Sequence, residues 1–263
     1  VIRGANALSF GKRSSDQTVL LWIGLYPNFR PMRILSTCCT LLIAASTHAQ
    51  LGPLITSWII NPGGELGYGG IPSNILAVSY SENNVYINCN SLPGHAIGPW
   101  PGDPWQPDEM GFTYKITRFP QENTGMPVQT PYGHIGTWIN GVSIYNPKDA
   151  HSWNEAGIWF QNAFFFEYTT FDDCLGHPND LNEYHTHVNP TCLYDENDST
   201  VHSPIIGWAF DGFPIYGAHG YANTDGSGGF TRMRSSWKLR NITDRSVLPD
   251  GTVLPLADQG PPL

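Results

Sequence analysis

Charged residues are scarce in this chain, and basic residues are the scarcer kind. Of 263 residues, 13% are charged, and the 13 Lys and Arg against 22 Asp and Glu give a formal net charge of −9 at pH 7. Without residues 1–49 the excess of acid is larger, because five basic residues but only one acidic residue lie there. Nucleic-acid binding requires basic surface that neutralises phosphate, so we predict no nucleic-acid partner, and this charge also disfavours anionic membranes.

Several common catalytic signatures are missing as well. The chain has no G-x-S-x-G nucleophile elbow, no Walker phosphate loop and no dinucleotide-binding glycine motif. These absences remove the main sequence-based reasons to propose a serine hydrolase, a nucleotide-binding protein or a Rossmann enzyme.

An apolar run of membrane-spanning length, about 20 residues, is missing too. The shorter run Ile34 to Ser46 follows Met32-Arg33 and precedes Thr47-His48-Ala49, which is the pattern of a secretion signal. We expect residues 32–49 to be a signal peptide, with cleavage after Ala49, no membrane insertion afterwards, and a secreted, extracellular or cell-surface location, periplasmic in a bacterium. Residues 1–31 contain no methionine and are expected to be a non-native upstream flank. The alternative is an unusual leader or a signal anchor that includes Thr18 to Tyr26.

Turn-forming residues are abundant, with 28 Gly and 22 Pro, and they separate short apolar and aromatic runs. Residues 62–72 and 93–107 are predicted loops, and Asn140-Gly141 predicts a two-residue hairpin. The remaining pattern predicts one all-β domain over residues 50–263, a sandwich or jelly-roll-like fold with long Gly- and Pro-rich loops. The predicted strands are Ile55 to Ile60, Asn74 to Ser79, Asn84 to Asn88, Phe112 to Thr117, His134 to Ile139, Val142 to Tyr145, Asn162 to Phe166, Tyr184 to Val188 and Ile206 to Phe210.

Three histidines lie close together in one segment. If Tyr184 to Val188 is a strand, the two-residue repeat places His185 and His187 on one face and Thr186 on the other. His177 precedes a Pro-Asn-Asp turn and could fold back to supply a third nitrogen. Three neutral imidazoles suit copper or zinc, so these histidines are candidate metal ligands.

Two further residues are candidate supports of the metal ligands, and one of them has an equal alternative. Tyr184 precedes His185 and Asp211 ends a predicted strand. Asp211 could accept the second ring N–H of a histidine, or it could be a turn aspartate that bonds its own backbone.

Cysteine usage fits an oxidising compartment. Cys174 and Cys192 flank the histidine segment and form our predicted disulfide, which would close a nineteen-residue loop and stabilise the fold by about 3 kcal/mol. Cys89 remains either a buried thiol or a partner of another cysteine or of a second molecule. A competing hypothesis makes Cys174 a soft metal ligand beside His177. The sequons at Asn197 and Asn241 predict exposed, glycosylated loops.

The aromatic residues allow two interpretations. Runs within predicted strands are expected in the core, whereas tryptophans within predicted loops either pin those loops or stack on a sugar. The expected core residues are Trp138, Phe164, Phe165, Phe166, Trp208 and Phe210. The loop tryptophans are Trp100, Trp105 and Trp153.

The histidine segment also resembles the YHYH-domain family of secreted or surface proteins, because it contains Tyr184-His185-Thr186-His187. The matching motifs are Cys174 to His177, Cys192, Ile205 to Gly217, Gly136 to Pro147 and Arg232 to Ser236. The resemblance covers about Val85 to the end, and Thr186 replaces the second tyrosine of the name motif. It implies a metal-binding extracellular β domain without an established reaction. Because relatives commonly continue further, we expect the chain to be truncated after Leu263.

The main hypothesis is a secreted protein that binds one transition metal, copper or zinc, and the sequence leaves open whether the metal serves an oxidase, a hydrolase or no reaction. The alternative is an extracellular structural or carbohydrate-contacting module in which the histidines form a buried hydrogen-bonded cluster. Its partners would be glycans or further copies of the chain.

Overall fold

The computed structural model describes residues 58–126, 128–235, 245–248 and 251–260, all of which belong to the unit Thr47–Leu263. The predicted signal peptide, the predicted upstream flank and the Asn241 sequon lie outside these residues. Within the described ranges, no helix has the length and apolar character needed to cross a membrane.

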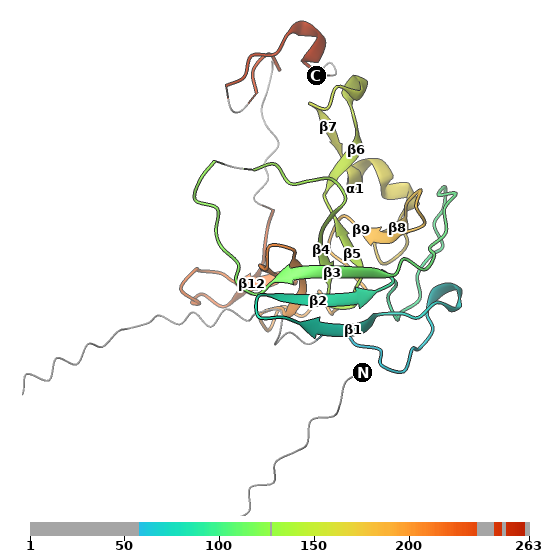
Figure 1. Cartoon of the computed structure of the whole chain (residues 1–263). Coiled ribbons are helices and arrows are strands. Elements are labelled where there is room, and N and C mark those ends of the chain that lie inside the picture. Colours follow the sequence, from blue (N-terminus) through green and yellow to red (C-terminus); the bar gives the residue numbers. More distant parts are fainter. Residues whose placement is uncertain (1–57, 127, 236–244, 249–250, 261–263) are drawn as a thin grey trace, which may run out of the picture. The chain divides into compact units, whose positions relative to one another are not determined.

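Strands dominate the described residues, and the all-β prediction is confirmed (Figure 1). The strands are β1 (Ile75–Tyr80), β2 (Asn84–Cys89), β3 (Phe112–Thr117), β4 (His134–Trp138), β5 (Ser143–Tyr145), β6 (Lys148–Ser152), β7 (Phe160–Asn162), β8 (Gly176–Pro178), β9 (Tyr184–Thr186), β10 (Ile205–Ala209), β11 (Pro214–Tyr216), β12 (His219–Tyr221) and β13 (Phe230–Arg232). The helical elements are α1 (Ala163–Glu167) and the short 3-10 turns η1 (Tyr68–Gly70), η2 (Trp153–Glu155), η3 (Tyr168–Thr170) and η4 (Leu256–Asp258).

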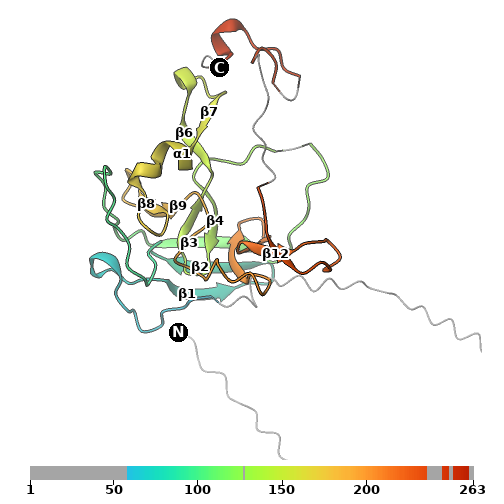
Figure 2. The same cartoon turned by 180° about the vertical axis from the view of Figure 1, so that it is seen from behind.

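Two larger sheets organise these strands. The antiparallel sheet β1-β2-β3 has three strands, and the mixed sheet has the order β11-β10-β4-β5-β9-β8. Its only parallel pair among the described strands is β5 with β9, and β8 then pairs antiparallel with β9 at the edge. Figure 2 shows β8 and β9 beside α1 from the opposite side. This arrangement places the predicted histidines at the end of the larger sheet.

Apolar residues form two buried clusters. One cluster joins the three-stranded sheet to Trp208 of β10, and the other gathers residues of β4, β5, β9 and β10 around Trp100. Cys89 lies in the first cluster as a free thiol, and burial raises its pKa to about 12, so it stays protonated. Its sulfur lies 3.1 Å from the carbonyl oxygen of Gly141, the hairpin glycine, which has a φ of +84°. A hairpin joins β4 and β5 as predicted, but its turn is longer than the predicted two residues, because residues 139–142 separate the strands and the N–H of Trp138 donates to the carbonyl oxygen of Val142.

Seven of the predicted strands coincide, within a few residues at their ends, with β1 to β5, β9 and β10. Of Ile55 to Ile60, only residues 58–60 are described, and Ile60 forms an isolated bridge with Ile75. The prediction of a strand from Asn162 to Phe166 is wrong, because Asn162 caps α1 by accepting the backbone N–H of Phe165 at 3.1 Å. Local capping therefore outweighs the strand preference of the aromatic run.

The same helix corrects the predicted core. Phe164, Phe165 and Phe166 are exposed, since only Ala163 of α1 is buried. Trp138 and Trp208 are buried as predicted, and Phe210 packs against the first cluster. The loop tryptophans differ from one another: Trp100 is buried and pins its loop, whereas Trp105 and Trp153 are exposed.

Candidate metal centre

The three predicted histidines converge on one point. His177 and His185 are direct cross-strand partners in the β8–β9 pair, and their Nε2 atoms lie 3.1 Å apart. His187 follows β9 on the side of His185, with 3.0 Å between the two Nε2 atoms. Thr186 points away, and its hydroxyl accepts the indole N–H of Trp138. A tetrahedral metal with bonds of about 2.0 to 2.1 Å needs nitrogen atoms about 3.3 Å apart, so the spacing is close to that of a ligand set.

Hydrogen bonds at the other ring nitrogens fix the tautomers. The Nδ1–H groups of His185 and His187 donate to the backbone carbonyls of Glu183 and Asn146, at 3.1 and 2.8 Å. Carbonyl oxygens only accept, so in neutral rings the Nε2 atoms carry lone pairs. The hydroxyl of Thr170 donates to the carbonyl of Glu167 and therefore accepts from Nδ1 of His177, at 2.7 Å. Three lone pairs consequently face one another.

Burial keeps the rings of His177 and His185 neutral. Desolvation, followed by the charge of His187, lowers the pKa of His177 to about 3. Desolvation also lowers the pKa of His185 well below its usual range, with added contributions from His177 and His187. Neutral imidazoles with free Nε2 atoms are the form that binds a metal ion.

Glu167, at the end of α1, is a fourth potential ligand that the sequence analysis missed. Its Oε2 lies 3.1 Å from Nε2 of His187 and 3.4 Å from Nε2 of His177. This oxygen is buried and has no hydrogen-bond donor among the described residues. A carboxylate oxygen that faces imidazole lone pairs is repelled unless a cation lies between them. One feature of the sequence could have identified Glu167 as a candidate ligand, because it is the only charged residue of the aromatic segment 156–171.

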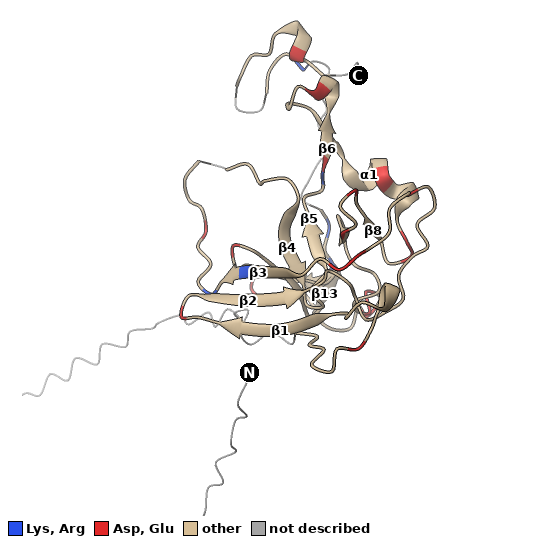
Figure 3. Ribbon diagram, turned by 45° about the vertical axis from the view of Figure 1, so that its right-hand side comes forward, with Lys and Arg blue, Asp and Glu red and all other residues tan. Residues whose placement is uncertain are grey.

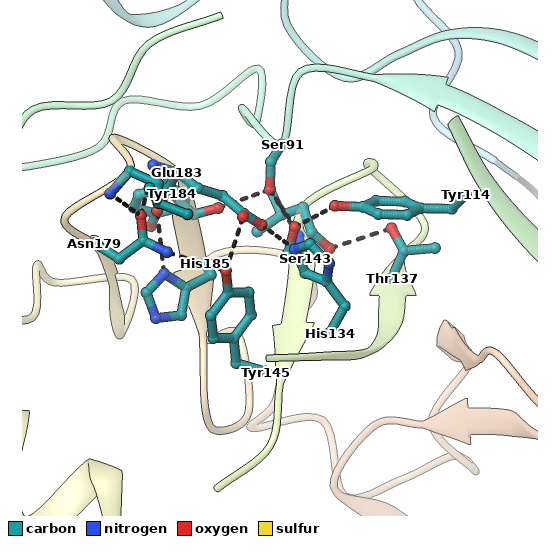
Figure 4. A network of polar contacts seen from close by, with 12 residues as sticks. Ser91, Tyr114, His134, Thr137, Ser143, Tyr145, Asn179, Glu183, Tyr184 and His185 are labelled. Carbon is teal, nitrogen blue, oxygen red and sulfur yellow. Dashed lines mark hydrogen bonds and ion pairs between the residues drawn. The ribbon is translucent and has the colours of Figure 1, made fainter. Parts of the chain in front are cut away.

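A buried polar network supports β9 behind the histidines (Figure 4). Glu183 is 2% exposed, and its carboxylate contacts Nε2 of His134 at 2.7 Å and accepts the hydroxyl of Tyr145 at 2.8 Å. The Tyr145 ring lies against the His185 ring, with the ring centroids 3.9 Å apart and an angle of 30° between the planes. Burial and the negative charge of Glu183 raise the pKa of Tyr145, so the phenol remains a donor. The network thereby holds the His185 ring in place.

Neither predicted supporting residue forms a hydrogen bond with the three histidines among the described contacts. The hydroxyl of Tyr184 donates to Asp172 at 3.0 Å, and its ring packs in the second apolar cluster because alternation along β9 directs it away from His185. Asp211 accepts the backbone N–H of Phe213 at 3.4 Å, which is the turn alternative. The histidine N–H groups are instead bound by Thr170, Glu183 and Asn146.

The cysteines also have defined places. Cys174 and Cys192 form the predicted disulfide, so Cys174 is not a metal ligand. His95 lies near both sulfurs. Asn197 is exposed in a loop, and its glycosylation stays a prediction.

A cleft of about 470 Å³ leads to the histidines. Segments that are distant in sequence line it, namely residues 102–105, 132–133, 145–146, 148–151, 167, 170, 177–180, 185 and 187. Acidic residues recur at α1 and in the loops near β8, whereas basic residues are few (Figure 3). An ion at the histidines would therefore be reachable from solvent.

Comparison with known proteins adds one finding. A family model described as YHYH protein matches residues 113–258, more than half of the chain. Neither the curated proteins nor the solved structures gave a match.

Proposed function

The chain belongs to the YHYH protein family, and from this premise we propose that it binds one transition metal ion through Nε2 of His177, His185 and His187. The observation that supports the proposal is the convergence of three buried imidazoles whose Nδ1–H groups are all used elsewhere. Metal ligands of this kind are generally oriented by such second hydrogen bonds.

Glu167 would complete the ligand set. Its unpartnered Oε2 adds a hard, negatively charged donor to three imidazoles. Imidazole suits copper and zinc, and a carboxylate is compatible with either ion, so copper or zinc remains our choice. The disulfide Cys174–Cys192 supports a secreted or extracytoplasmic location for the protein.

In the rival interpretation a proton, and no metal ion, lies between the Nε2 atoms of the histidines. Such a hydrogen-bonded cluster would suit a structural or glycan-contacting module. It requires at least one imidazolium, because neutral rings with Nδ1–H groups leave no proton between the Nε2 atoms of His185 and His187. Burial lowers the pKa of His177 and His185, which opposes a positive charge on either of these two rings near neutral pH. The lone-pair geometry therefore favours the metal.

The cleft favours a reactive centre over a purely structural one. Four protein ligands fill a tetrahedral zinc site, so water or a substrate from the cleft would have to enter as a fifth ligand, an expansion that catalytic zinc sites undergo. A bound ion would supply activation of water or oxygen in this cleft. The protein residues would hold the ion and keep the rings neutral, with Glu183 and Tyr145 fixing the orientation of His185.

Metal analysis tests this proposal. Purified parent protein, exposed to copper or zinc and then dialysed, should retain about one equivalent of metal, whereas His185→Ala and His187→Ala should retain almost none. His151→Ala is the matched control, because His151 lines the same cleft but is exposed and lies outside the cluster. Chelation should lower the melting temperature of the parent. Equal metal content in the parent and in His185→Ala would refute the proposal.

A further inference from the structure

The cleft contains a flat aromatic surface that the proposed metal centre does not use. Trp105 lines the cleft and is 43% exposed. Within the described residues its ring has no aromatic or cationic ring contact, whereas Trp100, in the same predicted loop, is buried against Tyr68 and Tyr184. An exposed indole beside an enclosed volume can stack on the apolar face of a ligand.

The two tyrosines that also line the cleft are already covered, Tyr145 by the His185 ring and Tyr132 by Lys148. The ammonium of Lys148 lies 4.1 Å from the centroid of the Tyr132 ring and 4.6 Å from that of Phe160. This cation–π contact occupies one face of the Tyr132 ring and engages Lys148, the one basic side chain among the described residues that line the cleft. Trp105 is consequently the available stacking surface.

Hydrogen-bond acceptors surround this surface. Asp103 and Asp149 line the cleft, and one oxygen of each accepts a backbone N–H, from Trp105 and His151 respectively, which orients the carboxylates. Asn179 and Asp180 add further polar groups. Acceptor-rich walls suit a ligand with many hydroxyl donors and disfavour an anion.

The net charge of the cleft indicates whether a neutral or a cationic ligand fits it better. The cleft holds the carboxylates of Asp103, Asp149, Glu167 and Asp180 and the ammonium of Lys148. A divalent ion at the histidines would nearly balance these charges, which removes much of the attraction for a cationic ligand. Flat apolar faces combined with hydroxyl groups are the chemistry of saccharides.

We propose that this cleft binds a neutral oligosaccharide, which stacks one ring on Trp105 and donates hydroxyl hydrogens to Asp103 and Asp149. The sugar would then lie in the same cleft as the metal centre, and it would be the substrate class of that centre. The substrate role and the preference for a neutral over a cationic ligand depend on the proposed function, whereas stacking on Trp105 does not itself need a metal.

Calorimetric titration tests the proposal with defined probes. The neutral probes are cellohexaose, xylohexaose, mannohexaose and laminarihexaose, and the charged controls are the hexamers of galacturonic acid and glucosamine. At least one neutral probe should bind, and Trp105→Ala should weaken its binding about tenfold. Trp153→Ala is the matched control, since Trp153 is 40% exposed but does not line the cleft, and its affinity should equal that of the parent. Circular dichroism checks the fold, and Trp105→Phe, which keeps a ring, should bind with intermediate affinity.

Three results would overturn the proposal: no binding of any neutral probe, tighter binding of the glucosamine hexamer by metal-loaded protein, or equal affinity of the parent and Trp105→Ala. Failure of the metal proposal would look different. In that case neither the parent nor Trp105→Ala would retain metal, while the neutral sugar would still bind to Trp105.

Discussion

Among the residues that the structure describes, two groups of three side chains are potential metal ligands, and one of the two groups has the free donor atoms of a metal site. The first group is His177, His185 and His187, and the second is His95, Cys174 and Cys192. Within each group the donor atoms lie within 4.8 Å of one another. In the second group the sulfurs are joined in a disulfide, so neither is a thiolate. In the first group hydrogen bonds at Nδ1 leave three lone pairs at Nε2. Proximity is therefore insufficient, and the bonding state of the donor atoms makes the difference.

The largest expected effect is on metal affinity, and it should differ between substitutions in the two groups. His185→Ala should weaken metal binding more than about 100-fold, because a lost ligand costs more than the loss of an outer hydrogen bond. His95→Ala should bind metal as tightly as the parent. Competition titration against a chelator of known affinity measures both. Comparable losses in the two variants would erase the distinction.

The disulfide of the second group should contribute to the free energy of unfolding and not to metal binding. The double variant Cys174→Ala, Cys192→Ala should lose about 3 kcal/mol of unfolding free energy, since the bridge closes a loop with a sequence separation of 18. Urea denaturation of the metal-free forms gives this value. The double variant should still retain about one equivalent of metal, and a variant that folds but loses its metal would show that the two regions are not independent.

Acid should destabilise the metal-free protein through the histidine cluster. Below pH 6.5 the unfolded chain protonates His177, but the folded chain does not until about pH 3, so stability falls as the pH falls between these values. At pH 5 the loss from His177 is about 2 kcal/mol relative to pH 8. His177→Gln should show a decrease that is smaller by about that amount in urea denaturation. Identical pH dependence in the two proteins would contradict the buried neutral ring.

The smallest expected effect concerns Glu167. Glu167→Gln removes a charge at nearly constant size and should weaken metal binding about tenfold, or 1.4 kcal/mol. Glu155→Gln is the control, because Glu155 is exposed and contacts only His151 among the histidines. If both variants bind metal as tightly as the parent, Glu167 is not a ligand.

Local patterns in the sequence predicted most of the histidine cluster. The spacing of His185 and His187 determines that alternate side chains share one face of an extended segment, and the flanking cysteines predicted the disulfide. The Asn140-Gly141 turn likewise required only local information. Such features depend on backbone geometry over a few residues.

Contacts between segments that are distant in sequence were either missed or wrongly predicted. Asp211 and Tyr184 belong to the sequence motifs that suggested a supporting role. In the structure Asp211 accepts a backbone N–H within its own turn, and the Tyr184 hydroxyl donates to Asp172. Glu167 was missed because the aromatic run before it was interpreted as a buried strand. An acceptor such as the carbonyl of Asn146 has no sequence signature at all, since every residue has a backbone carbonyl.

The amino-acid sequence by itself determined the strand alternation, the hairpin, the disulfide pair and the identity of three candidate ligands. The tertiary structure decided which tautomers those ligands adopt, which carboxylate joins them and which tryptophan reaches the cleft. The physical reason is that lone-pair direction, burial and charge at the site depend on contacts between β5, β8, β9 and α1. These contacts form only when segments distant in sequence pack together.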